Sequence, residues 1–193
     1  MEYLENEAAW HLPSRGRVAM ASLIVAESAV FTIFVVAYLY YLGRDQYGPT
    51  PRQVLEIPLF NTVCLLSSSF FIWLAERAIE HGRMKPFTLW WMITFLLGAI
   101  FLGGTGLEWY KLIAHDHLTI STNLFGTTFY SLVGLHATHV AIGLLLLLAV
   151  LLFAISGRLK PSHSERIQVL ALYWHFVDAV WVVVFTVVYI VGR

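Results

Sequence analysis

The chain of 193 residues is 59% hydrophobic and 12% charged, and its mean hydropathy is +0.72, which excludes an ordinary water-soluble domain. Twelve lysines and arginines balance twelve aspartates and glutamates, so there is no excess positive charge that would bind nucleic acid. The single cysteine, Cys64, excludes an internal disulfide and sites built from paired thiolates, such as a dinuclear copper centre or an iron–sulfur cluster. We therefore expect an integral membrane protein.

Apolar segments of membrane-spanning length follow one another along the chain. Residues 1–17 begin with acidic side chains, unlike a secretory signal peptide, so we expect the first apolar segment to be retained. Because a helix needs about 20 apolar residues to cross a bilayer, we predict five transmembrane helices, at residues 18–42, 57–79, 87–107, 124–155 and 169–191. All six prolines lie in connections or at a first helical turn. The predicted fold is all-α, a polytopic bundle forming one membrane domain over residues 1–193.

The distribution of lysine and arginine predicts how this bundle is oriented. With an odd number of spans the two chain ends lie on opposite sides, and cytoplasmic connections carry more positive charge. One side collects eight lysines and arginines and the other side four. The eight are Arg15, Arg17, Arg77, Arg83, Lys85, Arg158, Lys160 and Arg166, and the four are Arg44, Arg52, Lys111 and Arg193. We expect residues 1–17 to be cytoplasmic and the carboxyl terminus to lie outside.

The first predicted helix contains a single acidic residue, Glu27. It lies nine residues into the span, which is about 14 Å from the cytoplasmic end of the helix. An ionised carboxylate at this depth is costly and no cation is near it in the sequence, so we expect a neutral carboxyl group. Two interpretations remain: a hydrogen bond that ties two helices together, or a proton-handling group beside a partner subunit.

The second and third predicted helices carry milder polar residues. Asn61, Thr62 and the serine run that begins at Ser67 are interpreted as helix-packing groups that form interhelical hydrogen bonds. On the third helix a glycine-rich stretch, which permits close approach of another helix, ends just before Glu108. We expect Glu108 to lie at the outer interface of the membrane.

Histidines and an aspartate are concentrated in the fourth and fifth predicted helices. His136 and His139 are three residues apart and share one face, while Trp174, Asp178 and Trp181 share a face of the last helix. His175 lies beside that face. We expect an indole N–H of Trp174 or Trp181, or the imidazole of His175, to hydrogen-bond the carboxylate of Asp178. The simpler interpretation of this group is a structural hydrogen-bonded lock between helices.

The same histidines also allow a cofactor hypothesis. A haem needs two axial ligands on facing helices, and His175 together with His136 or His139 would supply them. Zinc is less favoured, since no third soft ligand is evident and Cys64 lies on a different helix.

Short motifs in a fixed order carry a family resemblance. They are Ile24–Ser28, Glu56–Thr62, Gly106–Tyr110, Gly126–Tyr130, Gly134–Val140 and Tyr173–Asp178. Together they resemble cytochrome c oxidase subunit III, the heme-copper oxidase subunit that carries no redox centre, in its short five-helix bacterial form. The resemblance covers nearly all of residues 17–192. Quinol oxidase subunits and an accessory protein of nitric oxide reductase share this form, and Glu27 with the Asn61–Thr62 pair favours the cytochrome c branch.

The resemblance implies a non-catalytic subunit in a bacterial cell membrane. It would pack directly against oxidase subunit I, in a proton-pumping complex that also contains subunit II, and would support assembly, proton uptake and the integrity of the active site. Haem and copper would lie in the partner subunits, and membrane phospholipid is the ligand expected for this chain. Glu27 matches the buried carboxylate of the family. The matching signature polar positions, carried over as structural and proton-supporting groups, are His136, His139, His175 and Asp178.

The chain also departs from the family. It lacks the two amino-terminal helices of the long form, so the lipid cleft that they build is not supplied by this chain alone. Thr105 replaces a glutamine found in many members three residues before Glu108, so we expect a rearranged polar contact there. Two more distant alternatives remain: a small b-type haem membrane protein, and a stand-alone proton or solute transporter.

Overall fold

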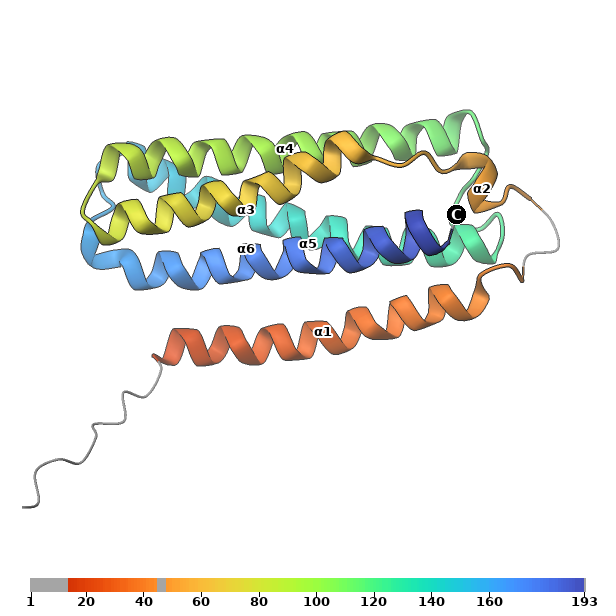
Figure 1. The fold of residues 1–193 in the computed structure, drawn as a ribbon, viewed down its shortest axis with the longest axis horizontal. Coiled ribbons are helices and arrows are strands. Elements are labelled where there is room, and N and C mark those ends of the chain that lie inside the picture. Colours follow the sequence, from red (N-terminus) through yellow and green to blue (C-terminus); the bar gives the residue numbers. More distant parts are fainter. Residues whose placement is uncertain (1–13, 45–47, 193) are drawn as a thin grey trace, which may run out of the picture.

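The computed structural model describes residues 14–44 and 48–192, which form an elongated bundle of helices (Figure 1). In this part of the chain five helices are long and apolar enough to cross a membrane, which confirms the predicted all-α membrane fold. They are α1 (Arg15–Tyr41), α3 (Leu59–Glu80), α4 (Met84–Ala114), α5 (Leu124–Ile155) and α6 (Ser164–Phe185). The shorter elements are α2 (Pro51–Val54), η1 (Pro161–His163) and the π-helix η2 (Thr186–Val191), which continues α6.

The helix boundaries differ from the predicted spans mainly in α4 and α6. The third span was predicted to end at residue 107, but α4 continues through its glycines to Ala114, because backbone groups at membrane depth must remain hydrogen-bonded within the helix. The connection to α5 is therefore only residues 115–123. The helical structure leading into α6 begins at Pro161 rather than residue 169, since the apolar pattern marks the hydrocarbon layer and not the helix end.

Glycines end two of the helices by adopting positive φ angles. Gly82 has a φ of 70°, and the following N–H of Arg83 donates to the carbonyl of Ala78 at 2.8 Å. Gly157 has a φ of 67° and the same arrangement follows α5. A left-handed residue at this position lets the chain leave the helix while its last carbonyls stay hydrogen-bonded. These turns allow α3 to α4, and α5 to α6, to run back across the membrane through short connections.

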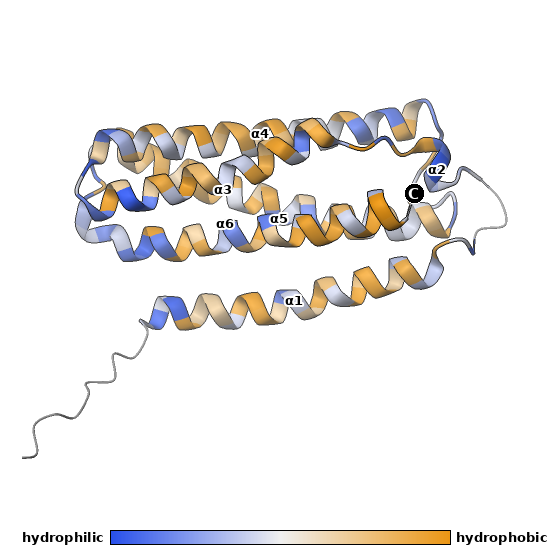
Figure 2. Ribbon diagram, viewed as in Figure 1, coloured by the Kyte–Doolittle hydropathy of each residue, from blue (hydrophilic) through white to orange (hydrophobic). Residues whose placement is uncertain are grey.

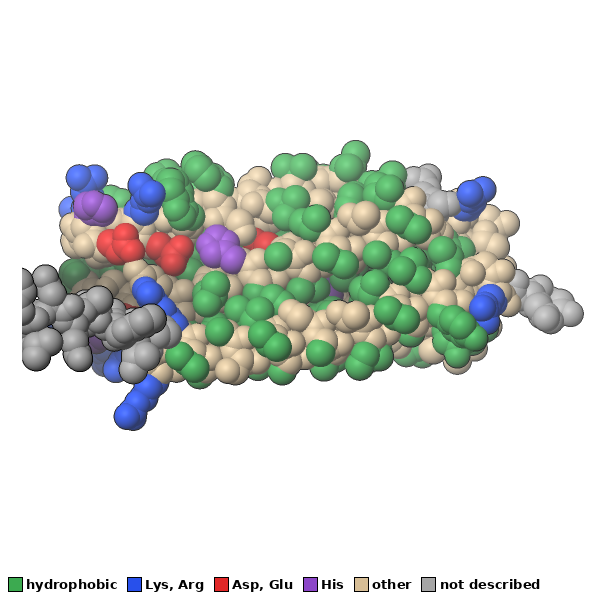
Figure 3. All heavy atoms as spheres, turned by 60° about the horizontal axis from the view of Figure 1, so that its bottom comes forward, with side chains coloured by type: hydrophobic (Ala, Val, Ile, Leu, Met, Phe, Trp, Pro, Cys, Tyr) green, Lys and Arg blue, Asp and Glu red, His purple; other side chains and the backbone are tan. Residues whose placement is uncertain are grey.

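Charge and hydropathy are separated along the bundle axis. Hydrophobic residues predominate in the middle of the helices, with a few hydrophilic positions among them, and hydrophilic residues gather at the ends (Figure 2). The start of α1, the α3–α4 turn and the α5–α6 connection lie at one end, so the eight lysines and arginines predicted to share a side do so in the structure. On the face in Figure 3, basic side chains gather at the ends of the molecule. Residues 1–13 and Arg193, which belong to the orientation prediction, lie outside the described residues.

Packing is tight among α3, α4, α5 and α6 and sparse around α1. The buried side chains of α1 are Phe31 and Tyr38. In contrast, the indole of Trp174 on α6 fills a slot between α4 and α5. A Cβ atom at Gly98 or at Gly143 would approach Trp174 atoms to 2.7 Å, so only glycine leaves room for this ring. Close backbone approach through small residues is the usual way for helices to pack inside a membrane.

Candidate functional site

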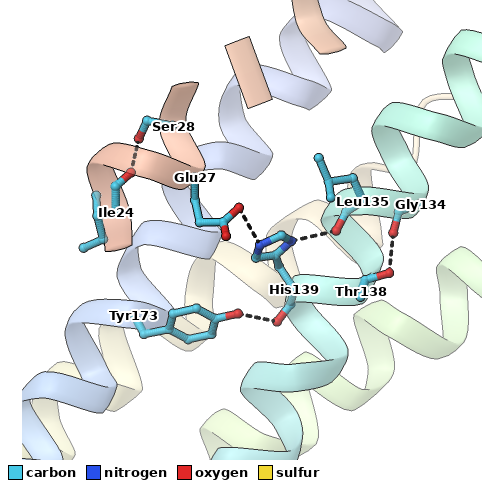
Figure 4. A network of polar contacts seen from close by, with 8 residues as sticks. All are labelled: Ile24, Glu27, Ser28, Gly134, Leu135, Thr138, His139 and Tyr173. Atoms are coloured by element: carbon cyan, nitrogen blue, oxygen red, sulfur yellow. Dashed lines mark hydrogen bonds and ion pairs between the residues drawn. The ribbon is translucent and has the colours of Figure 1, made fainter. Parts of the chain in front are cut away.

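Glu27 pairs with His139 and thereby joins α1 to α5 (Figure 4). The Nε2 atom of His139 lies 3.2 Å from Oε2 of Glu27, and its Nδ1 atom lies 2.8 Å from the carbonyl oxygen of Leu135. The hydroxyl of Tyr173 on α6 donates to the carbonyl of His139 at 3.2 Å. The sequence near Glu27 offers no such partner for the carboxyl group, because the imidazole comes from a residue 112 positions away.

The position of the hydrogen atoms in this pair follows from its partners. A carbonyl oxygen only accepts hydrogen bonds, so Nδ1 of His139 carries a hydrogen and Nε2 faces the carboxyl group. One proton can then lie either on the imidazole, giving an ion pair, or on Glu27, giving a neutral hydrogen bond. The pair thus holds one transferable proton between two helices, and the side chain of Glu27 remains 28% exposed.

His136 lies one helical turn before His139, and its surroundings are more apolar. Its ring stacks on Trp181 with centroids 5.0 Å apart and meets the edges of Phe31 and Phe101. Among the residues that the structure describes, neither nitrogen of this buried ring has a hydrogen-bond partner. Both rings contact Phe31, as expected for a shared face, but His139 also reaches a carboxyl group, whereas His136 lies among aromatic rings.

Asp178 is buried where α6 meets α3, and its carboxylate is bound by a serine. Ser69 of α3 donates its hydroxyl hydrogen to Oδ2 of Asp178, and the same hydroxyl lies 3.0 Å from Nδ1 of His175. On its other side His175 approaches Oε2 of Glu76 to 3.7 Å. Asp178 is 3% exposed, and its second oxygen has no hydrogen-bond partner within the described residues.

The indoles expected to bind Asp178 bind α3 instead. Trp174 donates to the hydroxyl of Ser68 at 2.8 Å, and Trp181 donates to Thr62 at 3.3 Å. Residues on one helix face point the same way, towards the opposing helix, so they bind groups across the interface rather than each other. The prediction of an indole partner was therefore wrong, and His175 reaches Asp178 only through Ser69.

The remaining predicted packing residues lie along the same interface. The amide of Asn61 lies against Gly104 of α4, where any larger residue would collide with it. Thr62 receives the indole hydrogen of Trp181, while Ser67 is half-buried and the interhelical bonds of the serine run come from its neighbours Ser68 and Ser69. The packing role of these positions stays a prediction for Ser67.

Glu108 lies at the opposite end of the bundle from the start of α1. The hydroxyl of Tyr189, in the π-helical end of the chain, donates to Oε1 of Glu108 at 2.9 Å. Glu108 lines a cavity of about 540 Å³ together with Glu56 and Lys111. Thr105, where the family often has glutamine, bonds the carbonyl of Phe101 on its own helix at 3.1 Å. It therefore makes no polar bridge of the kind that a longer side chain could form.

The contacts of the histidines bear on the haem and metal hypotheses. His175 contacts α3, His139 already engages both ring nitrogens, and His136 lies among aromatic rings. These contacts do not form the facing pair of free imidazoles that a haem requires. Within residues 14–44 and 48–192 no group of three or more His, Cys, Asp or Glu side chains is arranged to hold a metal ion.

Several residues of this polar network were not identified from the sequence. Glu76 and Tyr189 were not singled out, and Tyr173 entered only as part of a family motif. Ser68 and Ser69 belonged to the serine run interpreted as forming interhelical hydrogen bonds, without a partner being named for either. A usable signal was the i, i+4 spacing of Trp174 and Asp178, which places two polar groups on one face of α6, where both need polar partners on the facing helix. The adjacent residues Ser68 and Ser69 of α3 supply those partners.

Comparison with known proteins places these features in a family. Residues 17–193 match the family model described as "Cytochrome c oxidase subunit III". "Cytochrome c oxidase subunit 3" of Synechocystis sp. is 36% identical over 198 residues, covering 97% of this chain and 82% of the relative. "Quinol oxidase subunit 3" of Bacillus subtilis is 34% identical over 169 residues, covering 86% and 82%.

"Cytochrome bo(3) ubiquinol oxidase subunit 3" of Pseudomonas aeruginosa is 34% identical over 171 residues, covering 88% of this chain and 81% of the relative. The family model extends across all five long helices, and together with these relatives it confirms the resemblance first seen in the short motifs. The chain belongs to the cytochrome c oxidase subunit III family.

Proposed function

We propose that this chain is the redox-silent third subunit of a proton-pumping heme-copper oxidase. The observation that carries the proposal is the family match over residues 17–193, which includes every helix of the bundle. As a member of this family the chain is part of an oxidase complex, and it is a non-catalytic subunit of it. Dioxygen reduction takes place in the neighbouring subunits.

The proposed role of the chain is to support assembly, proton uptake and the integrity of the active site in subunit I, which it contacts directly. The Glu27–His139 pair supports this role, because it holds a proton at a place where α1 is packed sparsely and a second subunit could approach. Asp178, His175, His136 and Glu108 contribute as structural and proton-supporting groups. Haem and copper belong to the partner subunits, including subunit II, and phospholipid is the ligand we propose for this chain.

We propose that the end at which α1 begins is cytoplasmic and that the carboxyl terminus lies outside, in a bacterial cell membrane. The eight lysines and arginines at the first end support this orientation. For the electron donor we propose cytochrome c, supported by relatives that carry this name. Relatives named as quinol oxidase subunits make a quinol the alternative donor.

Purification through a tag on this chain in mild detergent tests the proposal. We expect a haem-containing complex whose optical spectrum shows a Soret band, with oxidase subunits I and II as the co-purifying proteins and oxidation of reduced cytochrome c as the activity. A Soret band retained by the separated chain would instead establish a b-type haem protein. Proton or solute flux through liposomes that contain only this chain would establish a transporter.

A further inference from the structure

A groove opens between α1, α3 and α6 at the end where α1 begins. It encloses about 1000 Å³. Arg17, Glu80 and Gln168 line its outer part, while Glu76 and His175 line its wall deeper in the bundle. In Figure 3 acidic and histidine side chains lie close together on this face, towards one end of the molecule. The groove thus brings polar groups from three helices to one side of the buried Asp178.

A continuous chain of polar contacts connects this groove to Asp178. Glu76 Oε2 lies 3.7 Å from His175 Nε2, His175 Nδ1 lies 3.0 Å from the hydroxyl of Ser69, and that hydroxyl binds Asp178. The side chain of His175 is 36% exposed and that of Glu76 is 19% exposed, whereas Asp178 is almost completely buried. This series of contacts therefore runs from an accessible imidazole to an inaccessible carboxylate through one hydroxyl group.

The donors and acceptors in this series of contacts determine where its hydrogen atoms lie. The hydroxyl of Ser69 has one hydrogen and donates it to Asp178, so it must accept from Nδ1 of His175. His175 in its neutral form then carries its hydrogen on Nδ1, and the lone pair of Nε2 faces Glu76 and the groove. This is the arrangement in which an imidazole can accept a proton from water on one side and release another on the opposite side.

We propose that Glu76, His175 and Ser69 form a proton relay through which Asp178 exchanges protons with water in the groove. A hydronium ion in the groove gives a proton to Nε2 of His175, either directly or through the carboxylate of Glu76, and is left as water. The Nδ1 proton passes to Ser69 as the serine hydrogen passes to Asp178. One proton has then moved from the groove to Asp178, and His175 is again neutral, with its hydrogen on Nε2.

The buried end of the relay gives this exchange a physical reason. An ionised carboxylate that lacks a partner for one of its oxygens is expensive to bury, and the arrival of a proton on Asp178 removes the charge. The transfer resets when the serine hydroxyl rotates and His175 exchanges its hydrogens with water. The relay itself does not depend on the proposed function; only its purpose, as a proton reservoir for a neighbouring subunit, rests on it.

The other charged groups around the groove have partners of their own. Arg17 of α1 donates to Gln168 at 2.5 Å, and Gln168 in turn donates to Glu80 of α3 at 2.6 Å. Arg77 of α3 stacks on the ring of Trp73 at 4.3 Å. From α4, Thr94 faces Ser68 and brings no charge to this interface. Glu76 is the carboxylate that contacts His175, and Glu80 is a matched carboxylate outside the relay.

Infrared spectroscopy of the purified oxidase complex during a change from H₂O to D₂O tests the relay. The C=O band of the Asp178 carboxyl group is identified by its loss in Asp178→Asn, or by its displacement in Asp178→Glu if the first variant does not assemble. We expect Ser69→Ala to slow deuteration of this group by roughly 100-fold or more, since a positioned proton-transfer group typically contributes about 10²- to 10⁴-fold. Glu76→Gln should slow it less.

Matched variants serve as controls. Ser67→Ala on the same helix and Glu80→Gln in the same groove should leave the rate of deuteration unchanged. Equal rates in Ser69→Ala and Ser67→Ala, or a lack of any protonated Asp178 band across the pH range in which the complex is intact, would overturn the relay. Loss of thermal stability in Ser69→Ala without slower exchange would show a structural lock only. Absence of haem from the same preparation would refute the proposed function and leave the exchange rates as a test of the relay.

Discussion

The two deep carboxyl groups of this bundle, Glu27 and Asp178, have opposite surroundings although the sequence places both about 14 Å from the same end. Glu27 belongs to the sparsely packed α1 and its side chain stays 28% exposed. Asp178 is 3% exposed on α6, whose neighbouring residues Trp174, Val177 and Trp181 are buried as well. The comparison teaches that depth in a membrane does not determine burial. A carboxyl group on a sparsely packed helix keeps part of its side chain exposed, while one in a tightly packed interface is enclosed by its neighbours.

The largest expected effect on stability is in the tightly packed part of the bundle, at Trp174. Trp174→Ala empties the slot between Gly98 and Gly143 and leaves the hydroxyl of Ser68 without its donor. We expect a loss of about 3–5 kcal/mol in the free energy of unfolding, the usual cost of removing a buried tryptophan. Thermal unfolding of the purified complex measures it. Trp73→Ala, at an exposed indole on α3, is the control and should cost far less.

A threonine pair compares the two regions directly. Thr62→Val removes the acceptor for the buried indole N–H of Trp181, and we expect it to cost about 1–3 kcal/mol because that donor is left unsatisfied. Thr32→Val on α1 removes a hydroxyl that donates to the carbonyl of Ser28 on its own helix. Chemical unfolding of both variants should separate them clearly. Equal losses would mean that α1 is packed as tightly as α6.

At the far end of α6 a tyrosine pair gives a smaller effect. Tyr189→Phe removes the hydroxyl that donates to Glu108, and we expect a loss of about 1 kcal/mol in stability, typical of one hydrogen bond. Tyr110→Phe changes an exposed hydroxyl on α4 and should leave the unfolding transition where it is. If both variants unfold alike, the Tyr189–Glu108 bond contributes nothing to stability.

The smallest change in stability is expected at Glu27. Glu27→Gln keeps a hydrogen-bond donor for Nε2 of His139, so the free energy of unfolding should change by less than about 0.5 kcal/mol. The amide holds no transferable proton, so we expect altered proton uptake or faster inactivation during turnover. Stopped-flow proton uptake and the number of turnovers before inactivation measure these effects. If neither changes, Glu27 is a packing residue.

Features set by neighbouring residues were predicted from the sequence, whereas contacts between residues far apart in the sequence were not. The long apolar segments sufficed for the five helices, because membrane depth leaves the backbone few alternatives to a helix. The same argument explains why glycines near Gly104 did not end α4. The Glu27–His139 pair escaped prediction, since no periodicity within one helix sets the rotation of α1 against α5. The indole partner predicted for Asp178 was wrong, because residues on one face of α6 bond to groups on the opposing helix and not to each other.

The sparse packing of α1 has a consequence for how the protein is made. Synthesis from the amino terminus brings α1 into the membrane before α5 and α6, the helices that it contacts, are made. Until then Glu27 and Phe31 have none of their final neighbours from this chain. An early α1 must wait in lipid or beside another protein.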